Sequence, residues 1–159
     1  MIKPGSLREH LTAALPELRR DPDKLLVFID RGSVVSTAAP GLSFEYRYTL
    51  NLILTDYAGH PDAVMVPLLV WLASHQPELL ANPSLREQIA FEADLLANDK
   101  VDLDIKIPLT ERVGVHARVG GGFDIEHYPE PQLELHLLAE HWALYVKNEL
   151  VATWDNPAR

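Results

Sequence analysis

Residues 42–55 hold the longest alternation of apolar and polar side chains in the chain, and this alternation limits the possible folds more than any other feature. The apolar positions are Leu42, Phe44, Tyr46, Tyr48, Leu50, Leu52 and Leu54. The positions between and after them are Ser43, Glu45, Arg47, Thr49, Asn51, Thr55 and the apolar exception Ile53. A period of two places the two sets on opposite faces of a sheet. We therefore predict a long central strand, with one face on a core, in an open antiparallel sheet.

Other segments are expected to complete this sheet. An apolar run at 25–29 reads as a buried strand, and Arg31-Gly32-Ser33 is expected to turn the chain into a second strand at 34–37. Further strands are expected to open at Ile89 and Phe91 and to cover 101–109, 113–119, 123–127, the alternation of Leu133, Leu135 and Leu137, and a terminal hairpin of 142–146 and 150–154 around 147–149. A helix over 138–147 is the rival interpretation of the last region.

Two helices are predicted. Ser6 and Glu9 have the spacing of a capping box, which predicts a helix over residues 6–15. A second helix is expected over 60–76, with Pro67 either kinking it or delaying its start to about Val66. The order of elements predicts an α+β fold in which two main helices pack on one side of a twisted antiparallel sheet. With 159 residues, the chain is expected to form one domain over 1–159.

Composition excludes several classes of function. The chain has no cysteine, so thiolate chemistry and cysteine-based zinc sites are absent, as is usual for a reducing cytoplasm. No apolar run reaches the ~18–20 residues of a membrane span, and the charged N-terminal segment differs from a secretory signal. The formal net charge of −9 argues against a nucleic-acid binder with a broad basic face. No cofactor is expected.

Three groups of residues resemble known chemical motifs. Gly120-Gly121-Gly122 has strands predicted on both sides, so a hairpin is favoured over a phosphate-binding loop. The seven histidines lack the four-residue pairing of a zinc helix, and the nearest group is His136 and His141 with Glu134 or Glu140. The sharpest enzymatic alternative is a divalent-metal nuclease that uses Asp62, Asp104 and Lys106. Periodicity instead places the last two on the polar face of a strand, and Asp62 falls at a helix start.

Several blocks of sequence resemble one protein family. They are 4–8 (PGSLR), 27–35 (VFIDRGSVV), 42–50 (LSFEYRYTL), 55–63 (TDYAGHPDA), 91–94 (FEAD), 98–103 (NDKVDL) and 109–113 (LTERV), with 149–152 (ELVA) and Trp154 as the most similar part of the C-terminal third. On these residues the chain resembles the tail completion protein R (gpR) family of temperate contractile-tailed phages and prophages.

The resemblance implies a structural virion protein that caps the finished tail tube and prepares the tail for head joining. It implies no catalytic residue. Tail terminators of similar size form hexameric rings, which suggests a ring-forming homo-oligomer that contacts tail-tube and head–tail connector proteins. Such a protein is expected in the host bacterial cytoplasm during assembly and then in the virion tail. The non-core face of the long strand supplies a candidate interface to other subunits or the tail: Glu45, Arg47, Thr49 and Asn51.

Overall fold

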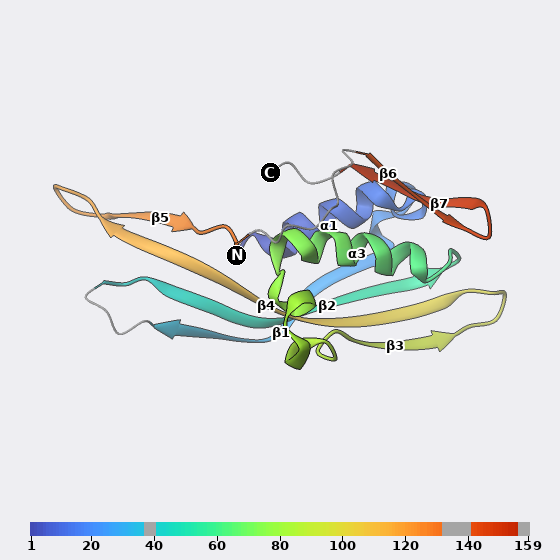
Figure 1. Ribbon diagram of the computed structural model, residues 1–159, viewed down its shortest axis with the longest axis horizontal. Coiled ribbons are helices and arrows are strands. Elements are labelled where there is room, and N and C mark those ends of the chain that lie inside the picture. The colour runs from blue at the N-terminus through green and yellow to red at the C-terminus, as the bar shows by residue number, and fades with distance from the viewer. Residues whose placement is uncertain (37–40, 132–140, 156–159) are drawn as a thin grey trace.

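A five-stranded antiparallel sheet forms the base of the molecule (Figure 1). The computed structural model describes residues 1–36, 41–131 and 141–155. The sheet consists of β1 (Leu25–Ser36), β2 (Phe44–Tyr57), β3 (Ala90–Leu95), β4 (Val101–Ala117) and β5 (Phe123–His127). Its order is β1-β2-β4-β3, and β5 also pairs with β4. The hairpin of β6 (His141–Val146) and β7 (Glu149–Asp155) forms a second, two-stranded sheet.

Two long helices, α1 (Lys3–Ala14) and α3 (Asp62–His75), lie side by side on one face of this sheet (Figure 1). The shorter elements are α2 (Pro16–Arg20), η1 (Pro22–Lys24), α4 (Glu78–Ala81) and η2 (Pro83–Leu85). None of the helices in the described ranges is long and apolar enough to cross a membrane. The predicted α+β fold, with two main helices on one side of an antiparallel sheet, is confirmed.

The register of β2 against β4 fixes the core. Leu50 lies opposite Ile107 and Leu52 opposite Ile105, so the apolar rows of both strands share the face under the helices. These residues form one buried cluster with Leu7 and Leu11 of α1, Leu68, Trp71 and Leu72 of α3, and Trp154 of β7. The prediction that residues 42–55 form a long central strand is confirmed from Phe44 onward, and the expected strand over 101–109 is its partner β4. The cluster includes residues from Leu7 to Trp154.

The first strand differs from its prediction. Residues 25–36 form one continuous strand, with a bulge between Ile29 and Arg31, in place of two strands joined by a turn at Arg31-Gly32-Ser33. The bulge adds one residue and restores the alternation, so that Val34 lies on the same face as Ile29. Because β2 offers a partner for the whole length, pairing is favoured over a local turn.

The first helix also differs from its prediction. It begins at Lys3, and no side chain caps it locally. Ser6 instead accepts a hydrogen bond from the indole Nε1–H of Trp71 at 3.1 Å. The capping box of Ser6 and Glu9 is therefore wrong, because a contact with α3 takes the hydroxyl. The second helix begins at Asp62 and continues through Pro67, so the alternative start near Val66 is also wrong.

The outer edge of β4 is left open for a few residues, and the chain passes through this opening. On that edge β3 pairs with β4 up to Lys106, and β5 pairs with β4 from Val113 onward. Between these points the segment from α3 to β3 leaves the helical side of the sheet (Figure 1). Pro108 lies on this stretch of β4, where β2 pairs with one edge, opposite Thr49, and no strand pairs with the outer edge. A residue without an N–H is tolerated at such an unpaired edge.

The described hairpin turns have backbone conformations that match their sequences. Gly120, Gly121 and Gly122 all have positive φ in the turn between β4 and β5, so the hairpin reading is confirmed. Lys147 and Asn148 have φ of 49° and 68°, which is typical of the two-residue turn between β6 and β7. The rival helix over 138–147 is wrong for residues 141–147. The expected alternation of Leu133, Leu135 and Leu137 lies outside the described residues.

The sheet is much longer than the helices that cover it. A 14-residue helix such as α3 is about 21 Å long, whereas a 17-residue strand such as β4 spans about 56 Å. Both ends of the sheet therefore extend beyond the helical layer (Figure 1). Residues that continue the core face into these ends are exposed: Val34, Phe123 and Ile125 at one end, and Phe91 and Leu95 at the other. Leu42 and Leu96, next to these strands, are exposed as well.

Candidate interaction surface

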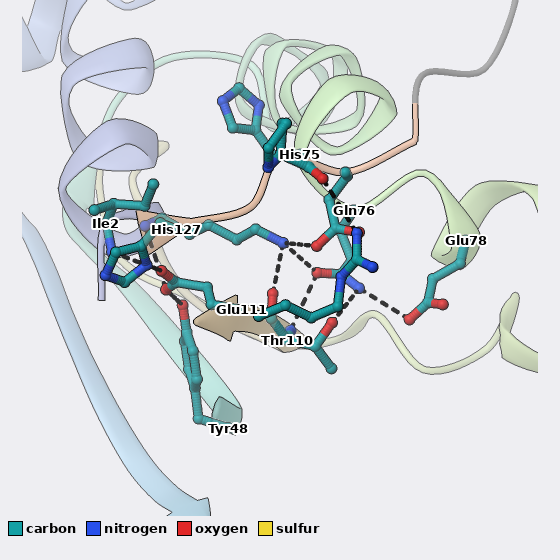
Figure 2. Close-up of polar contacts among 12 residues, drawn as sticks. Ile2, Tyr48, His75, Gln76, Glu78, Thr110, Glu111 and His127 are labelled. Carbon is teal, nitrogen blue, oxygen red and sulfur yellow. Dashed lines mark hydrogen bonds and ion pairs between the residues drawn. The ribbon is translucent and has the colours of Figure 1, made fainter. Parts of the chain in front are cut away.

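A buried carboxylate fixes the start of α1 to the sheet. Glu111 lies in the core-facing row of β4 and is only 3% exposed. Its Oε2 accepts a hydrogen bond from the backbone N–H of Ile2 at 2.7 Å, and its Oε1 accepts one from the Tyr48 hydroxyl at 2.5 Å (Figure 2). The ring Nδ1 of His127 lies 3.4 Å from Oε2. Glu111 thus replaces the local helix cap and interacts favourably with the positive end of the helix.

Lys3 and Gln76 close the open edge of β4. The Nζ of Lys3 donates to the carbonyl oxygen of Thr110 at 2.6 Å, and the backbone N–H of Thr110 donates to Oε1 of Gln76 at 3.1 Å. Lys3 also donates to Gln76 Oε1 and to Glu130 Oε1, at 2.8 and 2.9 Å. Gln76 Nε2 in turn donates to Glu78 and to the Thr110 hydroxyl (Figure 2). Two side chains therefore do the pairing that a neighbouring strand would do.

Burial perturbs the titration of two members of this cluster. Desolvation lowers the pKa of the Lys3 ammonium below its usual value, although Glu130 and Glu111 oppose the shift. Burial, and then the hydrogen bond to Glu111, raise the pKa of Tyr48 well above its usual value. The phenol therefore stays neutral and acts as a donor. The hydrogen bonds of this cluster join the start of α1 to β4 and to Gln76, so the cluster acts as a structural clamp between the helical layer and the sheet.

Three of the four predicted interface residues border hollows on the face away from the long helices. Glu45 and Arg47 border a hollow of about 680 Å³ with Arg112, Pro77 and Pro131 among its other lining residues. Arg47 and Thr49 border a second hollow of about 480 Å³, whose far wall includes Leu79 and Leu85. Arg47 is exposed and its Nε donates to Glu45 Oε1. The two hollows are open and carry both signs of charge.

Asn51 does not belong to this surface. Its side chain points to the predicted face but is only 2% exposed, and its Nδ2 donates to Asp30 Oδ2 at 2.6 Å. It lies between Phe28 on β1 and Lys106 on β4, whose longer side chains flank it. The prediction that Asn51 is available to a partner is therefore wrong, because a short residue on a paired central strand is covered by longer neighbours.

The residues of the nuclease alternative are not brought together. Asp62 lies at the start of α3, where its carboxylate is 3.3 Å from His60 Nδ1. Asp104 and Lys106 are 3.7 Å apart, but they lie on the face of β4 opposite the helices. Lys106 also faces Glu92 at 3.5 Å, and the carboxylates of Asp104 and Glu92 raise its pKa. The pair is thus part of a charged outer row, as periodicity indicated.

The histidines lie in separate places. His141 is 2.8 Å from Asp155 across the β6–β7 hairpin, and His116 is 3.4 Å from Glu126 on β5. The other members of the candidate cluster around His141, namely His136, Glu134 and Glu140, lie outside the described residues. Within the ranges that the structure describes, no three His, Asp or Glu side chains form a group that could hold a metal ion.

Sequence reasoning missed the Glu111 cluster, although a signal for it exists. Glu111 follows Leu103, Ile105, Ile107 and Leu109 at the same parity, so an acidic residue occupies a position of the core-facing row. A charge at such a position needs partners, since burying it alone is very costly. Its hydrogen-bond donors Ile2, Lys3 and Tyr48 are 109, 108 and 63 residues away in sequence, and no local pattern points to them.

Comparison with known proteins decides the family. A family model described as P2 phage tail completion protein R (GpR) matches residues 1–131. Tail completion protein R of Escherichia phage P2 is 40% identical over 156 residues, which cover 98% of this chain and 99% of that protein. This chain belongs to the phage tail completion protein R family. No solved structure matches it, so the likeness to tail terminators stays a prediction.

Proposed function

We propose that this chain is a structural tail completion protein that caps the assembled tail tube of a phage or prophage particle and prepares it for head joining. The observation that carries this proposal is the near full-length similarity to tail completion protein R of Escherichia phage P2. The chain acts during assembly in the host bacterial cytoplasm and then remains in the virion tail. It acts without catalysis or a cofactor, and the separation of Asp62 from Asp104 and Lys106 supports this.

The working form is a ring of identical subunits, with six subunits by analogy with tail terminators. Its partners are other copies, the tail tube and head–tail connector proteins, with no specific nucleic-acid or membrane binding. The net charge of −9 supports the last point, because an acidic ring repels the DNA that passes through the tail. Glu45, Arg47 and Thr49 form the candidate contact with the tail, since they border open hollows.

Deletion of the gene tests the role itself. We expect tails that are complete in length but do not join heads, as counted by electron microscopy of lysates, and a loss of plaque titre. Complementation with the wild-type gene restores both. Wild-type titre after deletion would overturn the assembly role.

A double charge reversal tests the candidate contact. Glu45→Arg with Arg47→Glu keeps the ion pair within β2 but inverts the pattern that a partner meets. We expect a folded protein by circular dichroism that fails to complement the deletion. Arg20→Glu on the exposed end of α2 is the matched control and should complement fully. Full complementation by the double variant would remove this face from the interface.

A further inference from the structure

The two ends of the sheet that extend beyond the helices differ in shape. At one end, pairing of β2 with β4 stops at Phe44 and Val113. Beyond this point β4 continues with β5, whereas β2 begins at Phe44, opposite Ser36 of β1. The β4–β5 hairpin and the β1–β2 pair therefore end apart from each other (Figure 1). We call this end, residues 31–36, 41–48 and 112–128, the fork. At the opposite end of the long axis, residues 90–106 form the single β3–β4 hairpin (Figure 1).

The fork has apolar side chains that nothing in the described chain covers. Ile125 lies opposite Val115 and Phe123 opposite Ala117, so both continue the face that carries the core. Ile125 is 58% exposed, and Val34 and Leu42 on the other hairpin are exposed to a similar degree. At the root of the fork, Ser43 Oγ accepts a hydrogen bond from the backbone N–H of Val115 at 3.0 Å. The two hairpins are therefore tied at their base and present apolar surface beyond it.

The β3–β4 hairpin also has apolar side chains that no other described element covers. Phe91 lies opposite Ile105 and Leu95 opposite Val101, again on the core-carrying face. Ile105 is fully buried beneath the helices, whereas Leu95 on the edge strand is 87% exposed. All six residues of β3 are exposed, and β3 pairs on one edge only. An exposed apolar edge strand is a ready site for association with another chain.

The two ends also differ in charge. The β3–β4 hairpin has a formal charge of −3, from five carboxylates against two lysines: Glu92, Asp94, Asp99, Asp102, Asp104, Lys100 and Lys106. The described residues of the fork have a formal charge of +1, from four arginines against three carboxylates: Arg31, Arg47, Arg112, Arg118, Glu45, Asp124 and Glu126. In a chain of net charge −9, the fork is the end that attracts an acidic surface.

We propose that the fork of one copy receives the β3–β4 hairpin of a second copy. This inference rests on the proposed self-association and names its surfaces. When this head-to-tail contact repeats, it covers the exposed apolar residues of both the fork and the β3–β4 hairpin in every subunit. It also places the acidic hairpin against the basic fork. Because the two surfaces differ and lie at opposite ends, the contact is heterologous, the type of contact that builds a ring when the rotation between successive copies closes. A contact of a surface with itself would place acidic hairpin against acidic hairpin.

Two single variants of the full chain test this contact. Leu95→Glu disables the hairpin, and Ile125→Glu disables the fork, while neither residue contributes to the core. We expect wild-type protein to show rising mass with concentration in analytical ultracentrifugation and each variant alone to be monomeric. Mixed at equal amounts, the two variants should form a dimer and nothing larger. The intact hairpin of one docks in the intact fork of the other, and the disabled ends stop growth.

Tyr145→Glu is the matched control, since Tyr145 is an exposed aromatic residue on β6 in the separate two-stranded sheet, and it should associate like wild type. Phe91→Ser and Phe123→Ser give a second pair of variants if either first variant loses its circular dichroism spectrum. Association that survives in both variants, or a mixture that stays monomeric, would overturn the proposed contact.

Phage complementation separates this contact from the proposed function. If deletion of the gene blocks head joining but both variants complement it fully, the tail role stands and the contact is wrong. If wild-type protein is monomeric at every concentration while the variants fail to complement, the bare ends bind a different tail protein, which also overturns the second copy as occupant. If deletion of the gene leaves the plaque titre unchanged, the proposed role in tail assembly is wrong. Analytical ultracentrifugation of the wild type and variants then still tests whether the fork binds the β3–β4 hairpin of a second copy.

Discussion

The middle and the ends of β4 follow the same rule of alternation but have opposite environments. Residues 103, 105, 107 and 109 are buried under α1 and α3, whereas the residues paired with 115 and 117 on β5 are exposed. Nothing in the local sequence separates the two stretches. The difference comes from the lengths of the covering helices, about 21 Å for α3 against about 56 Å of strand. Alternation thus determines which face is apolar, but another element determines whether that face is covered.

The same contrast applies to carboxylates. Glu111 in the middle of β4 accepts hydrogen bonds from Ile2 and Tyr48 and lies near the ammonium of Lys3. Glu126 on β5 is exposed and faces only His116. The first carboxylate connects the helical layer to the sheet, and the second is solvated. Matched substitutions in the two regions should therefore have very different consequences.

The largest effect is expected at Glu111. Glu111→Ala leaves the Ile2 N–H and the Tyr48 hydroxyl without their acceptor and removes a negative charge near the Lys3 ammonium. Breaking a buried charged interaction of this kind costs about 3–5 kcal/mol. Glu126→Ala, on the exposed arm, should change the free energy of unfolding by no more than about 0.5 kcal/mol. Urea denaturation followed by circular dichroism measures both. Glu111→Gln keeps an acceptor oxygen, so its free energy of unfolding should decrease less than that of Glu111→Ala.

If Glu111→Ala and Glu126→Ala decreased the free energy of unfolding equally, Glu111 would not act as a structural clamp. A loss in Glu111→Leu much smaller than in Glu111→Ala would show that the site tolerates an apolar filling, as some buried ion pairs do.

An apolar pair sharpens the same comparison. Ile107 is fully buried, whereas Ile125 on the fork is exposed, and both lie in core-face rows of the sheet. Ile107→Ala removes buried methylenes and leaves a cavity, at a cost of about 2–5 kcal/mol. Ile125→Ala should cost no more than about 0.5 kcal/mol in the dilute monomer. A loss for Ile125→Ala that grows with protein concentration would itself indicate that another copy covers the residue.

Much of the fold follows from local sequence. Alternation in 42–55 and 101–109 predicts the central pair of strands and their core-facing residues, whereas the register between them is seen only in the structure. The missed features all depend on distant partners. The bulge at Asp30 needs a β2 long enough to pair with all of β1, and the start of α1 at Lys3 needs Glu111, 108 residues away.

The candidate surface follows from sequence only in part. Periodicity places Glu45, Arg47, Thr49 and Asn51 on one face, but it does not indicate that Asn51 is covered or that α4 and η2 approach the others. Burial of a side chain on the outer face depends on the size of its neighbours on β1 and β4. The bare ends are likewise invisible in the sequence, because Phe91 and Ile125 look like core residues.

The smallest effect concerns histidines in the two regions. His75 stacks on Trp71 at 4.2 Å and its Nδ1–H donates to the Trp71 carbonyl at 2.9 Å, while His10 donates to the Pro67 carbonyl at 3.0 Å. Burial lowers the pKa of both rings below the usual 6.5. The unfolded chain therefore binds more protons than the folded chain between the lowered pKa and 6.5. The free energy of unfolding should decrease as the pH falls through that window.

Thermal unfolding at a series of pH values from about 7.5 to 5.5 measures this decrease. The double variant His10→Gln and His75→Gln should be less stable at neutral pH but should lose less on acidification than the wild type does, because its buried rings no longer titrate. The control is His116→Gln with His141→Gln, two exposed histidines, which should retain the wild-type slope. If the pH dependence of stability vanishes in the control variant and persists in the His10/His75 variant, it comes from the exposed histidines, which would contradict the burial of His10 and His75 as its cause.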